Sequence, residues 1–309
     1  MKKYFFTILI YLILATLTVI FIRNNYDDFA SIPEISVFYF SLMILVSFIS
    51  LFVNGLRIKL FGDYYNINLK KKEWFGLAAV TTMDNYLTPF RGGVAVRALY
   101  LRKVYNFPFK SFLTTIVASY TMRILIYSLF GIILSIISLT YYKIFNLWVF
   151  ILFMGLFLIS LIIVLFSPTF STRKNKFINW FVHILNDWRS ISKNYNFLIK
   201  LGLIELLFVS LMGVRLFFSY KAFNLSVPLL IVFIIAILST LSVFLAITPA
   251  GLGVTELVIT LSSAFVGLQL TEGGSVALLD RLSSVIIAFS FGTIFNYILM
   301  RDHKFLFVR

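Results

Sequence analysis

Long apolar stretches, separated by short polar segments, make up most of the 309-residue chain. A nearly uncharged run of about 18 or more residues can cross a bilayer as a helix, and soluble domains do not need a succession of such runs. The pattern therefore predicts an all-α integral membrane protein with a single transmembrane domain over residues 1–309. The strong runs are Tyr4–Ile22, Ile35–Leu56, Ser111–Thr140, Leu147–Phe166, Leu201–Tyr220, Val227–Ile247 and Val276–Met300, and the weaker ones are Trp74–Thr88 and Val254–Leu270.

Basic residues between the runs predict which helix ends face the cytoplasm. The chain begins Met-Lys-Lys, acidic residues follow the first run, and Lys70-Lys71-Lys72 follows the second. If every run crossed, the basic residues after the last run would lie outside, against the charge rule. Treating Trp74–Lys103 and Val227–Leu270 as hairpins that enter and leave on one side removes this conflict. We therefore expect about six full spans plus two re-entrant helical hairpins in the plasma membrane, with both termini cytoplasmic.

The two hairpins contain similar motifs, Thr88-Pro-Phe-Arg-Gly-Gly-Val-Ala-Val-Arg97 and Thr248-Pro-Ala-Gly-Leu-Gly-Val-Thr-Glu256. In both, a Gly-Val pair follows Thr-Pro at the same spacing, and an arginine (Arg123 or Arg281) lies in the helix that follows. The flanking helices run in opposite directions in the two halves, which predicts inverted repeats over approximately residues 35–166 and 201–300. Gly/Pro breaks at matching places in such repeats indicate a transport site near the membrane midplane.

The motifs predict where the helices break. Pro89 and Pro249 each remove a backbone donor, and the nearby glycines loosen the backbone. Broken backbone at membrane depth must be buried in protein or line a wet cavity, and freed amides at a helix N-terminus can face an anion. For either motif alone, a simple kink or a close helix crossing is the alternative. The candidate substrate-binding or gating residues are Arg91, Gly92, Gly93, Arg97, Arg123, Gly251, Gly253, Glu256, Asp280 and Arg281.

Charged residues at membrane depth are expected to have partners, because a central arginine costs about 2.5–3.5 kcal/mol on insertion scales. Arginines at positions 91, 97, 123, 215 and 281 fall in this class, whereas Arg57 is assigned to a basic inner loop. Arg97 and Glu256 occupy nearly equivalent repeat positions, so we expect them to form a central pair or gate. Ion pairs that only hold helices together are the alternative, most readily for Glu205 and Arg215.

A polar segment between the two halves, approximately residues 175–190, has apolar residues at helical spacing. They are Phe177, Trp180, Phe181, Ile184, Leu185 and Trp188. This spacing predicts an amphipathic helix, and its tryptophans favour a place in the inner headgroup layer. A helix packed on protein is the alternative.

Composition excludes several classes of function. The chain has no cysteine and only two histidines, His183 and His303, so thiol chemistry is excluded and a metal site is not expected. No nucleotide-binding loop or soluble catalytic signature is visible, and we expect no cofactor. The net charge of +15 is explained by basic cytoplasmic loops, so we expect no nucleic-acid partner.

These motifs resemble the membrane domain of the lysylphosphatidylglycerol synthase/flippase family. The resemblance covers most of the chain and rests on Pro89-Phe-Arg-Gly-Gly with Arg97 and Arg123, and on Pro249-Ala-Gly-Leu-Gly-Val-Thr-Glu256 with Gly267 and Asp280-Arg281-Leu282. The first motif has Val94-Ala95 where the family often has an acidic residue, so no role of that acid is carried over. Full-length members carry a soluble aminoacyl-transferase domain after the membrane part. Because this chain ends at Arg309, soon after its last predicted helix, the resemblance implies a translocator and not a synthase.

We therefore expect a flippase-like translocator, not an enzyme, for an amphiphile with an anionic or zwitterionic head group. A phospholipid, an aminoacyl-lipid, a glycolipid and a polyprenyl-phosphate-linked sugar all fit. The expected partners are membrane lipids and a lipid-modifying enzyme, and a homo-oligomer stays open. One alternative is a membrane-embedded transferase with Glu256 or Asp280 as general base. Another is a non-transporting scaffold that presents the helix around Trp180.

Overall fold

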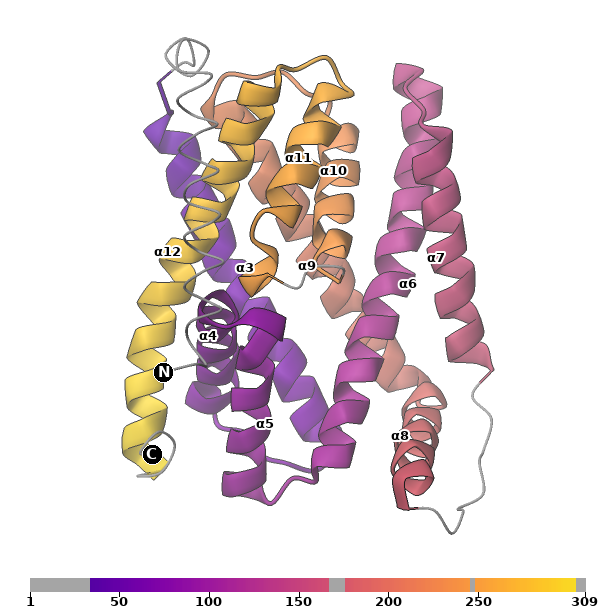
Figure 1. Ribbon diagram of the computed structural model, residues 1–309, viewed down its shortest axis with the longest axis vertical. Helices are drawn as coiled ribbons and strands as arrows, with labels where there is room; N and C mark the ends of the chain where they lie inside the picture. The colour runs from indigo at the N-terminus through magenta and orange to yellow at the C-terminus, as the bar shows by residue number, and fades with distance from the viewer. Residues whose placement is uncertain (1–33, 167–175, 245–247, 304–309) are drawn as a thin grey trace.

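The computed structural model describes residues 34–166, 176–244 and 248–303, and these residues form helices without strands (Figure 1). Within these residues, five helices are long and apolar enough to cross a membrane. They are α3 (Val37–Tyr64), α6 (Phe109–Tyr142), α7 (Leu147–Leu165), α9 (Tyr195–Ala222) and α12 (Leu270–His303). The prediction of an all-α membrane protein is confirmed. The first predicted span, Tyr4–Ile22, lies outside the described residues.

Two broken hairpins lie among the long helices. The first consists of α4 (Lys71–Leu87), the short helix η1 (Pro89–Arg91) and α5 (Gly92–Tyr105). The second consists of α10 (Leu229–Ser242), η2 (Pro249–Gly251) and α11 (Val254–Ala264). They occupy opposite halves of the bundle in Figure 1, and η1 contacts η2 near its middle. This arrangement is the one expected for two hairpins that enter from opposite sides, whereas the inverted-repeat symmetry itself stays a prediction.

The hairpins break at the two Thr-Pro motifs, but by different local means. In the first tip, the residues with positive φ are Phe90 (54°) and Arg91 (56°), and neither is a glycine. In the second tip, Ala250 (47°) is followed by Gly251 (73°) and Gly253 (84°). Non-glycine residues in this left-handed region store backbone strain, which accumulates at functional sites. The expectation that glycines loosen the backbone therefore holds only for the second tip.

Gly93, one of the predicted site residues, permits a close contact between two helices. A Cβ atom at this position would lie 2.1 Å from the Thr81 carbonyl oxygen, so no larger residue fits without a shift of backbone. The start of α5 thereby packs directly on α4. This contact holds the arginines of the first tip in a fixed position relative to the polar face of α4.

Two helix crossings make the most extensive contacts between the halves. The first is between α3 and α9, and the second is between α4 and α12. At the second crossing, the Phe75 ring lies 5.9 Å from that of Phe291 and 5.1 Å from that of Phe295, with the rings edge to face. Helix α7 packs chiefly on α6 at the side of the bundle, and only 11% of the residues in its most apolar stretch are buried. Its exposed apolar side chains suit contact with lipid.

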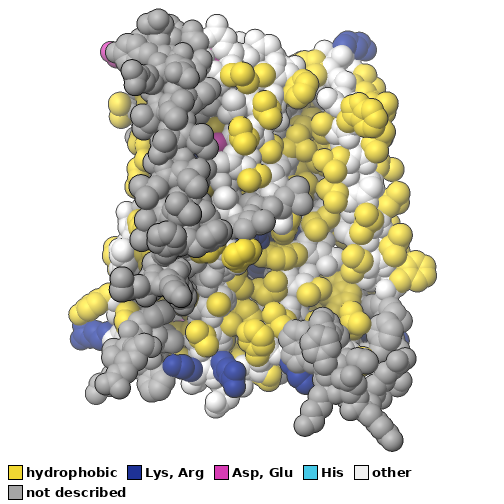
Figure 2. Space-filling view, in the orientation of Figure 1, with side chains coloured by type: hydrophobic (Ala, Val, Ile, Leu, Met, Phe, Trp, Pro, Cys, Tyr) yellow, Lys and Arg dark blue, Asp and Glu magenta, His cyan; other side chains and the backbone are white. Residues whose placement is uncertain are grey.

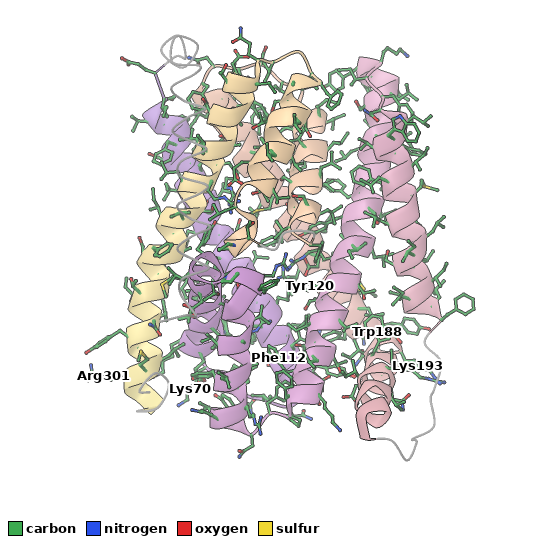
Figure 3. All side chains as sticks on the ribbon, in the orientation of Figure 1. Lys70, Phe112, Tyr120, Trp188, Lys193 and Arg301 are labelled. Carbon is green, nitrogen blue, oxygen red and sulfur yellow. The ribbon has the colours of Figure 1, made fainter. Side chains whose placement is uncertain are left out.

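Helix α8 (Lys176–Ser192) lies in the segment for which an amphipathic helix is predicted, and protein covers part of its apolar side. Ile184, Trp188 and Ile191 are buried, and the helix packs against α6. The Trp188 indole donates a hydrogen bond of 3.2 Å to the Ile163 carbonyl, so its polar atom is also satisfied by protein (Figure 3). The headgroup location of α8 stays a prediction, and Trp188 matches the alternative of a helix packed on protein.

Basic side chains gather at one end of the bundle. Figure 2 shows them along the lower edge, below a broad apolar surface. Among the described residues, the exposed ones at this end include Lys59, Lys70, Lys71, Lys72, Arg102, Lys103, Lys193, Lys200 and Arg301, whereas the opposite end carries Lys143 and Lys221. This asymmetry is typical of a multi-pass membrane protein whose basic end faces the cytoplasm.

Candidate functional site

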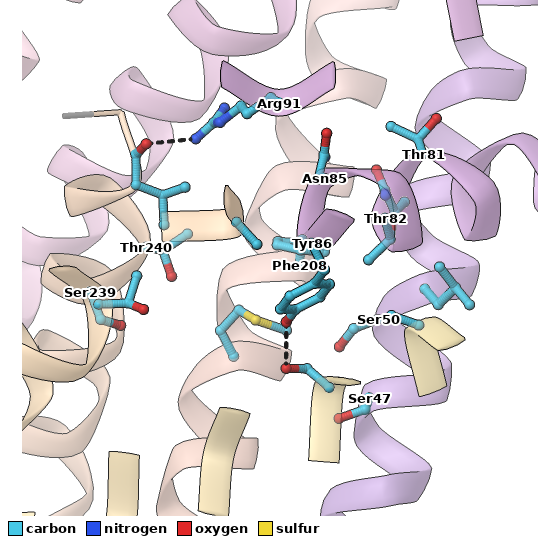
Figure 4. Close-up of a pocket in the computed structure, with 18 of the residues that line it drawn as sticks. Ser47, Ser50, Thr81, Thr82, Asn85, Tyr86, Arg91, Phe208, Ser239 and Thr240 are labelled. Carbon is cyan, nitrogen blue, oxygen red and sulfur yellow. Dashed lines mark hydrogen bonds between the residues drawn. The ribbon is translucent and has the colours of Figure 1, made fainter. Parts of the chain in front are cut away.

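A polar cavity of about 320 Å³ lies where the two hairpin tips meet α3, α6, α9 and α12 (Figure 4). Its wall carries hydroxyl and amide groups as well as arginines. The hydroxyl and amide residues include Ser47, Ser50, Thr81, Thr82, Asn85, Ser119, Ser239, Thr240 and Ser284. The lining arginines are Arg57, Arg91, Arg97, Arg123, Arg215 and Arg281, together with the carboxylates of Glu256 and Asp280. Broken backbone at this depth thus borders a polar space, as membrane helices require.

Arg91 connects the first tip to the second half of the chain. Its guanidinium donates to the Tyr120 hydroxyl at 2.6 Å and to the Val243 carbonyl, close to the end of α10, at 3.0 Å. The Tyr120 and Phe244 rings each lie 5.3 Å from the guanidinium carbon, at cation–π distance. These contacts are to neutral groups, so the positive charge of Arg91 stays uncompensated by any carboxylate that the described residues bring to it.

Arg281 holds the second tip. It forms an ion pair with Glu256, contacts the Thr255 hydroxyl, and donates to the Ala250 carbonyl at 3.1 Å. Glu256 in turn accepts a hydrogen bond of 2.8 Å from the Gly253 amide and so caps the start of α11. The amide freed by the helix break is therefore occupied by a side chain of the protein itself.

Asp280 pairs with Arg215 and not with Arg281, which follows it in the sequence. The Arg215 guanidinium donates two hydrogen bonds to the Asp280 carboxylate, at 2.8 and 2.7 Å. Such a paired arrangement is the strongest geometry available to arginine and a carboxylate. It joins α9 to α12 at the edge of the cavity.

Glu205 is fully buried and forms ion pairs with two arginines. Its carboxylate lies 2.7 Å from the Arg57 Nε and accepts from the Arg123 Nε at 3.1 Å and the Tyr127 hydroxyl at 3.4 Å. Glu205 and Arg215, which share a helix, thus each pair with residues of other helices. Burial of this triad requires the ion pairs, because an isolated charge in the interior is costly.

The assignment of Arg57 to an inner loop was wrong. Helix α3 continues past it to Tyr64, and Arg57 is buried. The basic neighbour Lys59 suggested a loop, but the apolar pattern continues through Ile58, Leu60 and Phe61 without a helix breaker. That continuation was the available signal, since apolar residues on one face of a helix extend the span.

Arg97 has no hydrogen bond or ion pair with any described residue. Its Nε atom is buried without a partner, and its guanidinium carbon lies 5.3 Å from the centre of the Phe112 ring. The predicted pair with Glu256 is not formed, because that carboxylate is held by Arg281. Both residues nevertheless line the same cavity, and Arg97 also borders a smaller pocket that extends between α3, α5 and α6.

The charges around the cavity do not balance. Six arginines line it, whereas the carboxylates that contact them are Glu205, Glu256 and Asp280. The formal excess is three positive charges. An arginine excess of this kind attracts an anion, and the planar guanidinium group suits phosphate or carboxylate. No group of metal-binding side chains occurs among the residues that were placed.

Comparison with known proteins gives one match. The family model described as lysylphosphatidylglycerol synthase TM region matches residues 5–292, which includes both hairpins and every residue of the cavity. No curated protein and no solved structure matches the chain.

Proposed function

The chain belongs to the lysylphosphatidylglycerol synthase transmembrane-region family, and from that premise we propose that it translocates a lipid with a phosphate-bearing head group across the membrane. The observation that carries this proposal is the cavity at the contact of the two hairpin tips, with its excess of arginine. Transporters built from broken helices place their substrate at such tips. A phosphate there would take hydrogen bonds from guanidinium groups that lack a carboxylate.

Arg91 and Arg97 are the proposed phosphate ligands. Each lines the cavity, and neither is paired with a carboxylate among the described residues. Arg97 is the stronger candidate because it has no hydrogen-bonding partner there at all. Keeping an unpartnered arginine in this place costs stability, which is reasonable if a ligand supplies the missing partner.

A lipid fits the surroundings of the cavity better than a soluble anion. Many large apolar side chains are exposed on the outside of the bundle, and on the face drawn in Figure 2 basic side-chain atoms lie at mid-height among them. A head group entering there would leave its acyl chains among lipid-facing side chains. We further propose that the protein resides in the plasma membrane, with its basic end and both termini cytoplasmic and a lipid-modifying enzyme as partner.

A transferase is the less favoured function. A general base needs a carboxylate that is free to accept a proton, whereas Glu256 and Asp280 are both held in ion pairs with arginine. A scaffold that acts only through α8 would leave the arginine excess of the cavity without a purpose. We therefore propose a translocator and not an enzyme.

The test is lipid translocation by the purified protein in liposomes. Phosphatidylglycerol with a fluorescent acyl chain is placed in both leaflets, and a membrane-impermeant quencher reports movement between them. We expect quenching beyond half of the signal with the wild-type protein, and a loss of at least tenfold in rate with Arg97→Gln. Arg102→Gln, an exposed arginine on the same helix, is the matched control and should behave as wild type. Quenching that stays at protein-free levels for anionic and zwitterionic phospholipids alike would refute the proposal.

A further inference from the structure

Most hydroxyl groups of the cavity wall already donate their hydrogen atom to a backbone carbonyl group. Ser50 donates to the Val46 carbonyl at 2.7 Å, and Thr82 donates to the Ala78 carbonyl at 2.8 Å. The same pattern holds for Ser119, Ser239, Thr240 and Ser284, which donate to carbonyls three or four residues earlier in their own helices. What such a hydroxyl offers the cavity is its acceptor lone pairs. This wall is therefore matched to a ligand that donates hydrogen bonds.

Two further polar atoms, which belong to residues that line the cavity, have no hydrogen-bond partner among the residues that the structure describes. The Thr81 hydroxyl and the Asn85 side-chain carbonyl are buried without a hydrogen bond. They are four residues apart, on one face of α4, and both line the cavity. Unsatisfied buried polar atoms are rare in folded proteins, and a pair on one face indicates a place that a ligand or water fills. Figure 4 shows Thr81, Thr82 and Asn85 together on this side of the cavity.

The donor that fits this wall is a neutral hydroxyl and not an ammonium. Each of the three carboxylates near the cavity is already paired with arginine, and the formal excess of three positive charges remains. A cationic head group would meet this repulsion and would find no free carboxylate among the described residues that line the cavity. Breaking an existing pair to supply one would leave a buried arginine without its partner, which is costly.

We propose that the cavity selects anionic lipids whose phosphate carries a neutral, hydroxyl-bearing head group, such as glycerol or a sugar, and rejects aminoacylated cationic lipids. Arg91 and Arg97 bind the phosphate, and Thr81 and Asn85 bind the hydroxyls beyond it. This inference rests on the proposed function for its biological use. It concerns binding, however, and can be measured without translocation.

The test is competition for the purified full-length protein in detergent, read by native mass spectrometry. Equal amounts of phosphatidylglycerol and its lysyl ester are offered together. We expect about tenfold more bound phosphatidylglycerol with the wild type, since repulsion and a missing hydroxyl both act against the ester. Thr81→Val and Asn85→Leu should each lower phosphatidylglycerol binding about fivefold and leave binding of phosphatidic acid, which has no head group, unchanged. Thr293→Val is the matched control, because this threonine is exposed on α12.

The outcomes separate the two proposals. Equal or preferential binding of the lysyl ester overturns the selectivity, whether or not the protein translocates lipids. Selective binding of phosphatidylglycerol without translocation supports the selectivity and refutes only the transport function. Displacement of phosphatidylglycerol by millimolar glycerol phosphate, with no lipid retained, assigns the same chemistry to a soluble ligand and overturns the lipid part. If Thr81→Val fails to fold, the Asn85 variant and the wild-type competition still decide.

Discussion

Arg215 and Asp280 face each other across two parallel hydrogen bonds of 2.8 and 2.7 Å, and each side chain is only 12% exposed. Arg215 belongs to α9 and Asp280 belongs to α12, so this pair joins two of the helices that surround the second hairpin. It also keeps the Asp280 carboxylate from any other partner. The pair therefore has a structural role that can be separated from substrate binding.

Removal of one member of this pair should destabilise the protein more than removal of both. Arg215→Leu leaves Asp280 buried without a counter-ion, and we expect a loss of about 3–5 kcal/mol. The double change Arg215→Leu/Asp280→Leu should recover most of that loss, because no charge is left unpaired. Thermal unfolding in detergent measures both. Additive destabilisation in the double variant would contradict the pairing.

Glu205 should be the more sensitive member of its triad. Glu205→Gln leaves Arg57 and Arg123 both unpaired and close together, so we expect a large drop in folded yield. Arg57→Gln leaves the carboxylate paired with Arg123 and should cost less. Fluorescence-detected size-exclusion chromatography of the two variants gives the order. The reverse order would show that Glu205 does not depend on both arginines.

A methyl group at position 93 should disturb the first hairpin. Gly93→Ala brings a Cβ to 2.1 Å from the Thr81 carbonyl oxygen, so α5 must move away from α4. We expect a loss of about 1–3 kcal/mol from overpacking, and slower translocation because Arg97 moves with α5. Gly155→Ala is the matched control, since apart from the neighbouring backbone of its own helix no described atom lies within 4 Å of the added methyl group. Equal behaviour of the two variants would contradict the close contact.

The orientation in the membrane can be tested by labelling, because the chain has no cysteine of its own. Lys143→Cys and Arg102→Cys place single thiols at opposite ends of the bundle, at exposed positions. In intact cells, an impermeant maleimide should label position 143 and not position 102, since the basic end is expected in the cytoplasm. Labelling at 102 alone would invert the orientation.

Much of the fold follows from the sequence alone. The lengths of apolar runs predicted the long helices, because a span must satisfy its backbone internally over a fixed thickness. Paired Thr-Pro motifs and the distribution of lysine and arginine predicted two broken hairpins, and the tips of these hairpins meet around a polar cavity. These features depend on local chemistry and on periodicity, which are visible in a single chain.

The ion pairs, in contrast, were decided by tertiary structure. Sequence position suggested that Arg97 would face Glu256, and that Arg57 would lie in a loop. In the structure Glu256 pairs with Arg281 and Arg57 pairs with Glu205, whereas Arg97 has no hydrogen-bonding or ion-pair partner among the described residues. Which charges meet depends on the rotation and depth of each helix. Those are set by packing such as the contact of Gly93 with Thr81, and apolar periodicity in membrane helices does not encode them.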